Sequence, residues 1–153
     1  MVKIVAYETI YADAFREINE EWINKYFKME ETDRKALYSP EEYILKNGGA
    51  ILIALENEEP VGVCALMKME DSKYDFELAK MGVRPDNQGK GIGKRLGKAI
   101  LDAAKSRGAN SICLETNTVL KAAIVLYQKL GFTKVIGNPT PYERCNYQME
   151  LHF

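Results

Sequence analysis

The sequence predicts an α+β fold in which a central, mainly antiparallel mixed sheet is flanked by helices. Three strand-like segments follow one another in the middle of the chain, at residues 50–56, 61–69 and 76–83. A strongly periodic helix comes directly after them, and a shorter strand–helix–strand–strand series completes the chain. The predicted order is therefore β-α-α-β-β-β-α-β-α-β-β. Since there are no repeats or linkers, we expect a single domain over residues 1–153.

The first third of the chain reads as one strand followed by helical segments. Residues 2–7 have a strand pattern, and residues 13–27 have large apolar side chains at the spacings of three and four that are typical of a helix. These side chains are Phe15, Ile18, Trp22 and Tyr26. A second short helix is predicted over residues 31–38. Pro40 is expected to open a third helical turn that stops at Gly48-Gly49.

The three central strands are joined by segments with turn compositions. Asn57-Glu58-Glu59-Pro60 separates residues 50–56 from residues 61–69, so these two strands are expected to pair as a hairpin. Asp71-Ser72 is predicted to form the next turn, before the strand at residues 76–83.

The most regular helix of the sequence is predicted from Ile92 to a stop at Gly108. Its apolar residues recur at helical spacing and so form one face of the helix, and most of its charged residues lie outside that face. The remaining elements are predicted as strand 111–115, helix 120–130 with Gly131 as its C′ residue, strand 132–136 and strand 146–153.

Composition and charge exclude several classes of protein. The 153 residues, 46% of them hydrophobic, can form one core of ordinary size. A net charge of −1 and a pI near 5.9 indicate no general attraction to nucleic acid or to an anionic membrane. No apolar run approaches the roughly 20 residues of a transmembrane helix, and the first residues enter a strand without a signal-peptide core. We therefore expect a cytoplasmic protein without nucleic-acid or membrane partners.

The cysteines and the single histidine favour neither a metal site nor a common catalytic triad. Cys64, Cys113 and Cys145 are odd in number and widely spaced, so they are predicted to be small core residues rather than disulfide or zinc ligands. His152 stands next to the C-terminus, which leaves no Ser-His-Asp or Cys-His arrangement in the usual sense. We predict no bound metal.

The most informative segment is the glycine-rich loop QGKGIGK at residues 88–94, between the last central strand and the long helix. The first turn of a helix leaves N–H groups without partners and carries partial positive charge, and an anion satisfies both. The three glycines leave no Cβ between those amides and a ligand, and the two lysines add positive charge. By itself, such a loop is equally compatible with a capping or packing role. The candidate phosphate-binding residues are Gln88, Gly89, Lys90, Gly91, Ile92, Gly93 and Lys94.

The common nucleotide-binding loops do not fit this segment. A P-loop requires a Gly-Lys-Ser/Thr end, whereas the Gly-Lys pairs here are followed by Gly91 and Arg95. A dinucleotide fingerprint requires Gly-x-Gly-x-x-Gly near the start of a parallel sheet, whereas this run reads Gly-x-Gly-x-Gly past the middle of the chain.

Two motifs together resemble the GNAT superfamily of CoA-dependent N-acetyltransferases. Gln88-x-x-Gly91-x-Gly93 matches the superfamily's core motif Gln/Arg-x-x-Gly-x-Gly/Ala. The stretch 114–117, Ala123 and the stretch 126–132, which contains Tyr-x-x-x-Gly-Phe, are similar to its later strand–helix segment. The resemblance spans nearly the whole chain in element order, and it implies a GNAT-like fold.

The resemblance also implies acetyl-CoA as co-substrate. The pantetheine arm is then expected to pair with the exposed backbone of Met81, Gly82 and Val83, and the pyrophosphate with the amides of residues 88–94. Asn117 is expected to take over a CoA contact, because Leu120 stands where family members often have an asparagine. The candidates for binding the 3′-phosphate are Lys90, Lys94, Arg95 and Lys98. The alternative is that they form an ordinary solvent-exposed basic face of the helix.

Two residues are expected to carry the chemistry. Glu77 stands where several family members place a glutamate as general base; the alternatives are a base that acts through water and an ordinary solvated strand residue. Tyr127 occupies the family position of the general acid that protonates the CoA sulfur, and a core tyrosine is the alternative.

The implied function is acetyl transfer from acetyl-CoA to a primary amine by direct attack in a ternary complex. A small molecule, a peptide N-terminus and a protein lysine all remain open as acceptors, as does the oligomeric state, a homodimer included. The alternatives are a non-catalytic acyl-CoA sensor or partner-binding module and a nucleotide-phosphate enzyme. Candidates for the acceptor pocket are Trp22, Tyr26, Tyr38, Tyr142, Glu143 and Arg144, with the acidic residues Glu20, Glu21, Glu30 and Glu31 as candidates for attracting a cation.

Overall fold

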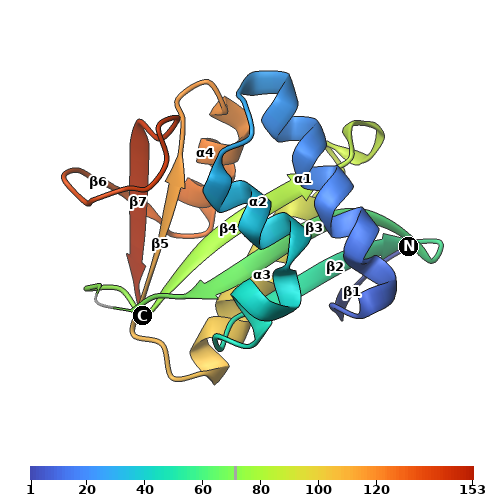
Figure 1. Cartoon of the computed structure of the whole chain (residues 1–153), viewed down its shortest axis with the longest axis horizontal. Coiled ribbons are helices and arrows are strands. Elements are labelled where there is room, and N and C mark those ends of the chain that lie inside the picture. Colours follow the sequence, from blue (N-terminus) through green and yellow to red (C-terminus); the bar gives the residue numbers. More distant parts are fainter. Residues whose placement is uncertain (71) are drawn as a thin grey trace.

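The computed structural model describes residues 1–70 and 72–153, which form a seven-stranded sheet with the order β1-β2-β3-β4-β5-β7-β6 (Figure 1). The strands are β1 (Val2–Ala6), β2 (Ala50–Glu56), β3 (Glu59–Lys68), β4 (Phe76–Val83), β5 (Ser111–Thr116), β6 (Thr133–Val135) and β7 (Tyr147–His152). Neighbouring strands of the described residues pair in antiparallel fashion, except that β4 and β5 are parallel. The predicted element order and mainly antiparallel mixed sheet are thus confirmed.

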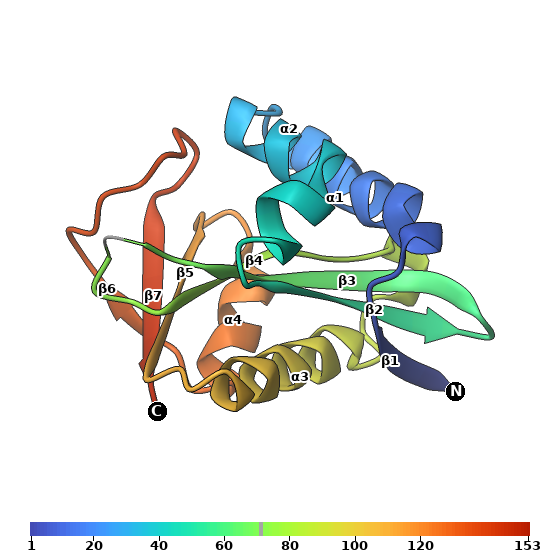
Figure 2. The ribbon, with the colours of Figure 1, turned by 60° about the horizontal axis from the view of Figure 1, so that its bottom comes forward.

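Helices cover both faces of the sheet (Figure 2). One face carries α1 (Ala12–Tyr26), α2 (Glu31–Tyr38) and the π-helical turn η2 (Glu41–Leu45), and the other carries α3 (Ile92–Ser106) and α4 (Lys121–Lys129). Two short 3₁₀ turns, η1 (Thr9–Tyr11) and η3 (Pro85–Asn87), precede α1 and the glycine loop.

The sheet separates two hydrophobic cores. Leu96, Ile100 and Ala104 of α3 are fully buried against one face, in a cluster with residues of β3, β4, β5 and α4. Phe15, Ile18 and Ile23 of α1 are buried against the other face, with residues of α2, η2, β2 and β3. The three-and-four periodicity of both helices therefore corresponds to the faces that they bury.

The structure departs from the predicted elements in two turns. The β2–β3 connection is two residues long instead of four: Asn57 and Glu58 have φ of 51° and 67°, as in a type I′ turn, so Glu59 already pairs with Glu56. The turn after Pro40 is π-helical, with the Lys46 amide donating to the Glu41 carbonyl at 2.9 Å. Of the predicted turn Asp71-Ser72, Asp71 lies outside the described residues.

Strands β4 and β5 pair only at their beginnings. Phe76 lies opposite Ile112 and Glu77 opposite Cys113, after which the strands fan apart (Figure 1). On its other side β4 has a bulge against β3, at Lys80, whose φ is 52°. Bulges bend a strand and re-aim its side chains. The sheet is therefore open between the carboxyl ends of β4 and β5, which is where the glycine loop begins.

Candidate active site

A cleft of about 620 Å³ lies at this opening. Its walls come from the end of α1, from β4, from the glycine loop with the start of α3, from the end of β5, from α4 and from the loop before β7. The cleft has two parts that differ in character. The part beside the glycine loop is lined largely by glycines and by residues at the start of α3, and the part beneath α1 is lined by aromatic and charged residues.

The glycine loop presents free amides to the cleft. Gly89 and Gly91 both have φ of 80°, and a Cβ added to either would meet no atom within 4 Å. Gly91 is the N-cap of α3 and supplies no side-chain cap. The amides of residues 89–94 donate no hydrogen bond to any described residue. This arrangement of open amides at a helix N-terminus fits a phosphate group.

The predicted loop residues differ in what they contact. All of residues 88–94 except Lys90 line the cleft. The Lys90 ammonium lies 3.6 Å from Glu56 Oε1 instead. Gln88 Nε2 donates to the Val83 carbonyl at 3.1 Å, which fixes the loop to the end of β4. A Cβ on Gly93 would lie 3.1 Å from Leu126 Cδ2, so this glycine allows α3 to approach α4 closely.

The basic residues proposed for the 3′-phosphate differ in whether they line the cleft. Lys94 lines the cleft, whereas Arg95 donates to the Val2 carbonyl at 2.7 Å. Lys121 and Lys129 of α4 line the cleft as well. The sequence analysis missed these two lysines, because only the packing of α4 beside the opening brings them there.

Met81 and Val83 of β4 line the cleft beyond the point where β5 leaves. Gly82 faces α1 instead: a Cβ at this position would lie 2.9 Å from Trp22 Cδ1, so the glycine makes room for the indole. Asn117 lines the cleft, but its Nδ2 donates to the Arg144 carbonyl at 2.7 Å and its Oδ1 accepts from the Val119 amide at 2.9 Å. Both polar atoms of Asn117 thus already hold loops together.

Glu77 is the last residue of β4 that pairs with β5, and its side chain lines the cleft. It is partly buried, and its carboxylate has no hydrogen-bond partner in the described part of the chain. Burial and the nearby negative charge of Glu115 raise the pKa of Glu77 to about 7, although the positive charge of Lys80 opposes the shift. A carboxylate with this pKa is suited to accept protons near neutral pH.

The sequence analysis missed Glu115 as a partner of Glu77. Cys113 pairs with Glu77 in the parallel register, and Glu115 stands two residues further along β5, so it lies on the same face of the sheet. Gln148 Nε2 donates to Glu115 at 3.3 Å. The parallel pairing of the two strands was the signal that could have identified this residue.

Tyr127 projects from α4 into the cleft and is 8% exposed. Its ring packs edge-on against Phe132, with 6.1 Å between centroids. Among the described residues its hydroxyl has no hydrogen-bond partner. Burial raises the pKa of Tyr127 further above 10, so the phenol keeps its proton at neutral pH.

Four of the six acceptor-pocket candidates line the cleft: Trp22, Tyr26, Tyr142 and Arg144. Phe27, which the sequence analysis did not single out, lines it too. Tyr38 and Glu143 lie outside it, and the Tyr38 hydroxyl donates to Glu20 at 2.7 Å. Of the acidic candidates, Glu30 approaches the site through a contact of 3.5 Å with Arg144.

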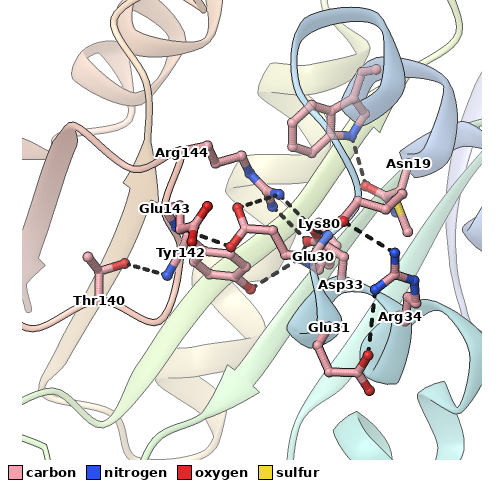
Figure 3. Close-up of polar contacts among 12 residues, drawn as sticks. Asn19, Glu30, Glu31, Asp33, Arg34, Lys80, Thr140, Tyr142, Glu143 and Arg144 are labelled. Atoms are coloured by element: carbon pink, nitrogen blue, oxygen red, sulfur yellow. Dashed lines mark hydrogen bonds and ion pairs between the residues drawn. The ribbon is translucent and has the colours of Figure 1, made fainter.

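A buried ion cluster lies beside the aromatic part of the cleft (Figure 3). The Asp33 carboxylate accepts two hydrogen bonds of 2.6 Å from Arg144 and one of 2.6 Å from Lys80. Lys80 also donates to the Tyr142 hydroxyl at 3.1 Å. Although burial opposes ionisation, the bonds from Arg144 and the charge of Lys80 hold the pKa of Asp33 at about 2. No local pattern relates these residues, which are 47 to 111 positions from Asp33.

The cysteines have two kinds of surroundings. Cys64 and Cys113 are buried, as predicted, whereas Cys145 is partly exposed and lines the cleft. Across residues 1–70 and 72–153, His, Cys, Asp and Glu side chains form no cluster of three or more that could hold a metal ion. The helices of the same residues are too short or too polar to cross a membrane.

Comparisons with known proteins identify the family and the fold. The model of the acetyltransferase (GNAT) family matches residues 12–132. A probable N-acetyltransferase, camello, from Xenopus tropicalis is 29% identical over 92 residues, which are 60% of this chain and 42% of the relative. The match therefore covers less than half of that curated relative.

Two solved structures share the fold over almost the entire chain. An acetyltransferase of the GNAT family from Staphylococcus aureus Mu50 has a TM-score of 0.89 and 21% identity over 99% of both chains. An N-acetyltransferase from Thermoplasma acidophilum, in complex with coenzyme A, has a TM-score of 0.77 and 19% identity over 100% of this chain and 99% of that one. Because the family model spans most of the chain, from α1 through the glycine loop to the end of α4, this chain belongs to the acetyltransferase (GNAT) family.

Proposed function

We propose that this chain transfers the acetyl group of acetyl-CoA to a primary amine by direct attack in a ternary complex. One observation carries the proposal: a single cleft joins an open phosphate cradle to a carboxylate whose pKa lies near 7. Membership of the family supports it, and so does the CoA complex of a protein with the same fold.

The cofactor half would hold CoA mainly through backbone. The free amides of residues 89–94 would bind the pyrophosphate, and Lys94 adds positive charge from within the cleft. The pantetheine arm would run along Met81 and Val83, where β5 no longer covers the edge of β4. When bound there, acetyl-CoA supplies the activated thioester.

Glu77 is proposed as the base. An alkyl amine with a pKa near 10 is mostly protonated at neutral pH, so a proton must leave before nitrogen attacks the thioester carbonyl. The Glu77 carboxylate faces the cleft and has no competing hydrogen bond from the described residues. It would take the proton directly or through one water molecule, and Glu115 would maintain its proton affinity.

Tyr127 is proposed as the acid. The departing CoA thiolate needs a proton or a strong hydrogen bond. The Tyr127 hydroxyl keeps its proton at neutral pH, lines the cleft and is free of other partners in the described chain. It would donate that proton to sulfur as the tetrahedral intermediate collapses.

The experiment that tests the function is calorimetric titration with acetyl-CoA and with CoA, followed by a thiol-release assay over a broad panel of amines. Micromolar binding together with amine-dependent thiol release is expected. Binding without thiol release from any amine would favour a non-catalytic acyl-CoA sensor. Failure of both ligands to bind would remove the basis of the proposal. Strong thermal stabilisation by Mg-ATP but not by CoA would indicate a nucleotide enzyme instead.

A further inference from the structure

We infer that the acceptor is a primary amine with an aromatic or apolar body and no free carboxylate, and that Asp33 determines this preference by neutralising Lys80 and Arg144. The inference rests on the proposed function, because it concerns the acceptor half of the same cleft. It is carried by the pairing of charges around that half, by the geometry of Arg144 and by the aromatic walls.

The two cations of the acceptor half are already paired. Lys80 and Arg144 line the cleft, and both bind Asp33, which lies behind them and is 0% exposed. Glu30 lies 3.5 Å from Arg144 as a second carboxylate. The wall that these four residues form thus contains two positive and two negative groups, and it presents no uncompensated cation to a substrate.

The two terminal nitrogens of Arg144 already bind a carboxylate of the protein. A guanidinium recognises a carboxylate best through two parallel N–H bonds, and Arg144 uses both of its terminal nitrogens in this way on Asp33, at 2.6 Å each. Aromatic rings flank its planar faces, with the Tyr142 ring centroid at 4.7 Å and those of Trp22 and Phe27 at 5.8 Å. Its side chain is 13% exposed.

The acceptor half also contains two acidic side chains that are not paired in this way. Glu77 and Glu115 line the cleft from the two diverging strands, and neither takes part in an ion pair within the described residues. Their field attracts an ammonium group and repels a carboxylate. The remaining walls are the rings of Trp22, Tyr26, Phe27 and Tyr142, which suit an apolar body attached to the amine.

Asp33 is held in place independently of any substrate. It is the N3 residue of a capping box on α2, in which the Glu30 amide donates to Asp33 Oδ2 at 2.9 Å. Its carboxylate therefore accepts bonds from α2, β4 and the loop before β7 at once (Figure 3). Loss of this one charge would leave the wall with two cations and one carboxylate, that of Glu30.

The test compares amines of similar basicity that differ by one carboxylate: phenethylamine with phenylalanine, and tryptamine with tryptophan. We expect the wild-type chain to show a kcat/KM at least about tenfold higher for the carboxylate-free member of each pair. Equal or better use of phenylalanine or tryptophan would overturn the inference while leaving acetyl transfer intact. Turnover of polar amines only, with none of phenethylamine or tryptamine, would also overturn it.

Two variants test the role of Asp33 in opposite directions. Asp33→Asn should reduce the preference for phenethylamine over phenylalanine by about tenfold, because the wall then holds two cations and only one carboxylate. Arg144→Gln should increase this preference, because the wall then carries an excess of negative charge. This variant tests the inference independently if Asp33→Asn does not fold. Unchanged preference in a folded variant would overturn the assignment of Asp33. Failure of the proposed function would look different, since no amine would then release thiol from acetyl-CoA, whether or not acetyl-CoA binds.

Discussion

The two halves of the cleft are built by different means. The proposed cofactor half is built around a continuous stretch, residues 88–94, in which the amides of residues 89–94 donate no hydrogen bond to any described residue. The acceptor half is assembled from side chains that lie as far apart in the sequence as Trp22 and Arg144, with Asp33 behind them. A backbone site depends on local conformation and glycine, whereas a side-chain site depends on the packing of distant elements. The first kind can therefore be read from a motif, and the second can change its specificity without changing the motif.

The largest effect is expected from Gly91→Glu in the cofactor half. The substitution places bulk and negative charge at the phosphate cradle, so CoA affinity should fall by at least about 100-fold in calorimetry. Gly108→Glu is the matched control, since Gly108 ends the same helix with φ of 79° and open space around its Cα. The two variants share the strain of a side chain at positive φ, about 1–2 kcal/mol. Equal CoA affinity in both variants would show that the loop does not bind the cofactor.

Glu77→Gln should lower kcat/KM by roughly 100-fold while CoA affinity stays the same. The wild-type rate should rise with pH through an apparent pKa near 7, because the carboxylate must be ionised to accept a proton. The variant should lose this dependence. Glu59→Gln, at an exposed position of β3, is the control. A loss of only a few-fold would favour a base that acts through water.

Tyr127→Phe should lower kcat by about tenfold or more, because the sulfur loses its proton donor. The aromatic packing against Phe132 is retained, so thermal stability should change little. Tyr74→Phe is a suitable control, since Tyr74 is also buried, but its hydroxyl donates to Glu150 away from the cleft. Equal turnover of wild type and Tyr127→Phe across the whole pH range would exclude the general-acid role.

Glu115→Gln should have the smallest effect, a displacement of the pH profile. Removing its negative charge lowers the pKa of Glu77, so the acidic limb of kcat/KM should move to lower pH. The glutamine oxygen can still accept the bond from Gln148. An acidic limb at the wild-type position would mean that Glu115 does not act on the base.

Local patterns predicted most of the fold. The bounds of α2, β2 and β4 agree with the prediction to the residue, because turn residues and apolar periodicity mark their ends. The β2–β3 turn was predicted too long, because Asn57 and Glu58 adopt positive φ without a glycine. The π-helical turn at Glu41–Leu45 was not predicted, since its one-residue excess leaves no distinct composition.

The sequence by itself determined the order of the elements, the glycine loop and the placement of Glu77 and Tyr127 on their strand and helix. Each depends on residues that are neighbours in the chain or that match a contiguous motif. Only the tertiary structure decided which charges meet: Glu115 with Glu77 across the diverging strands, and Asp33 with Lys80 and Arg144 over 47 and 111 positions. The physical reason is that an ionisable side chain has no preferred partner until folding excludes water and fixes which opposite charge lies within bonding distance.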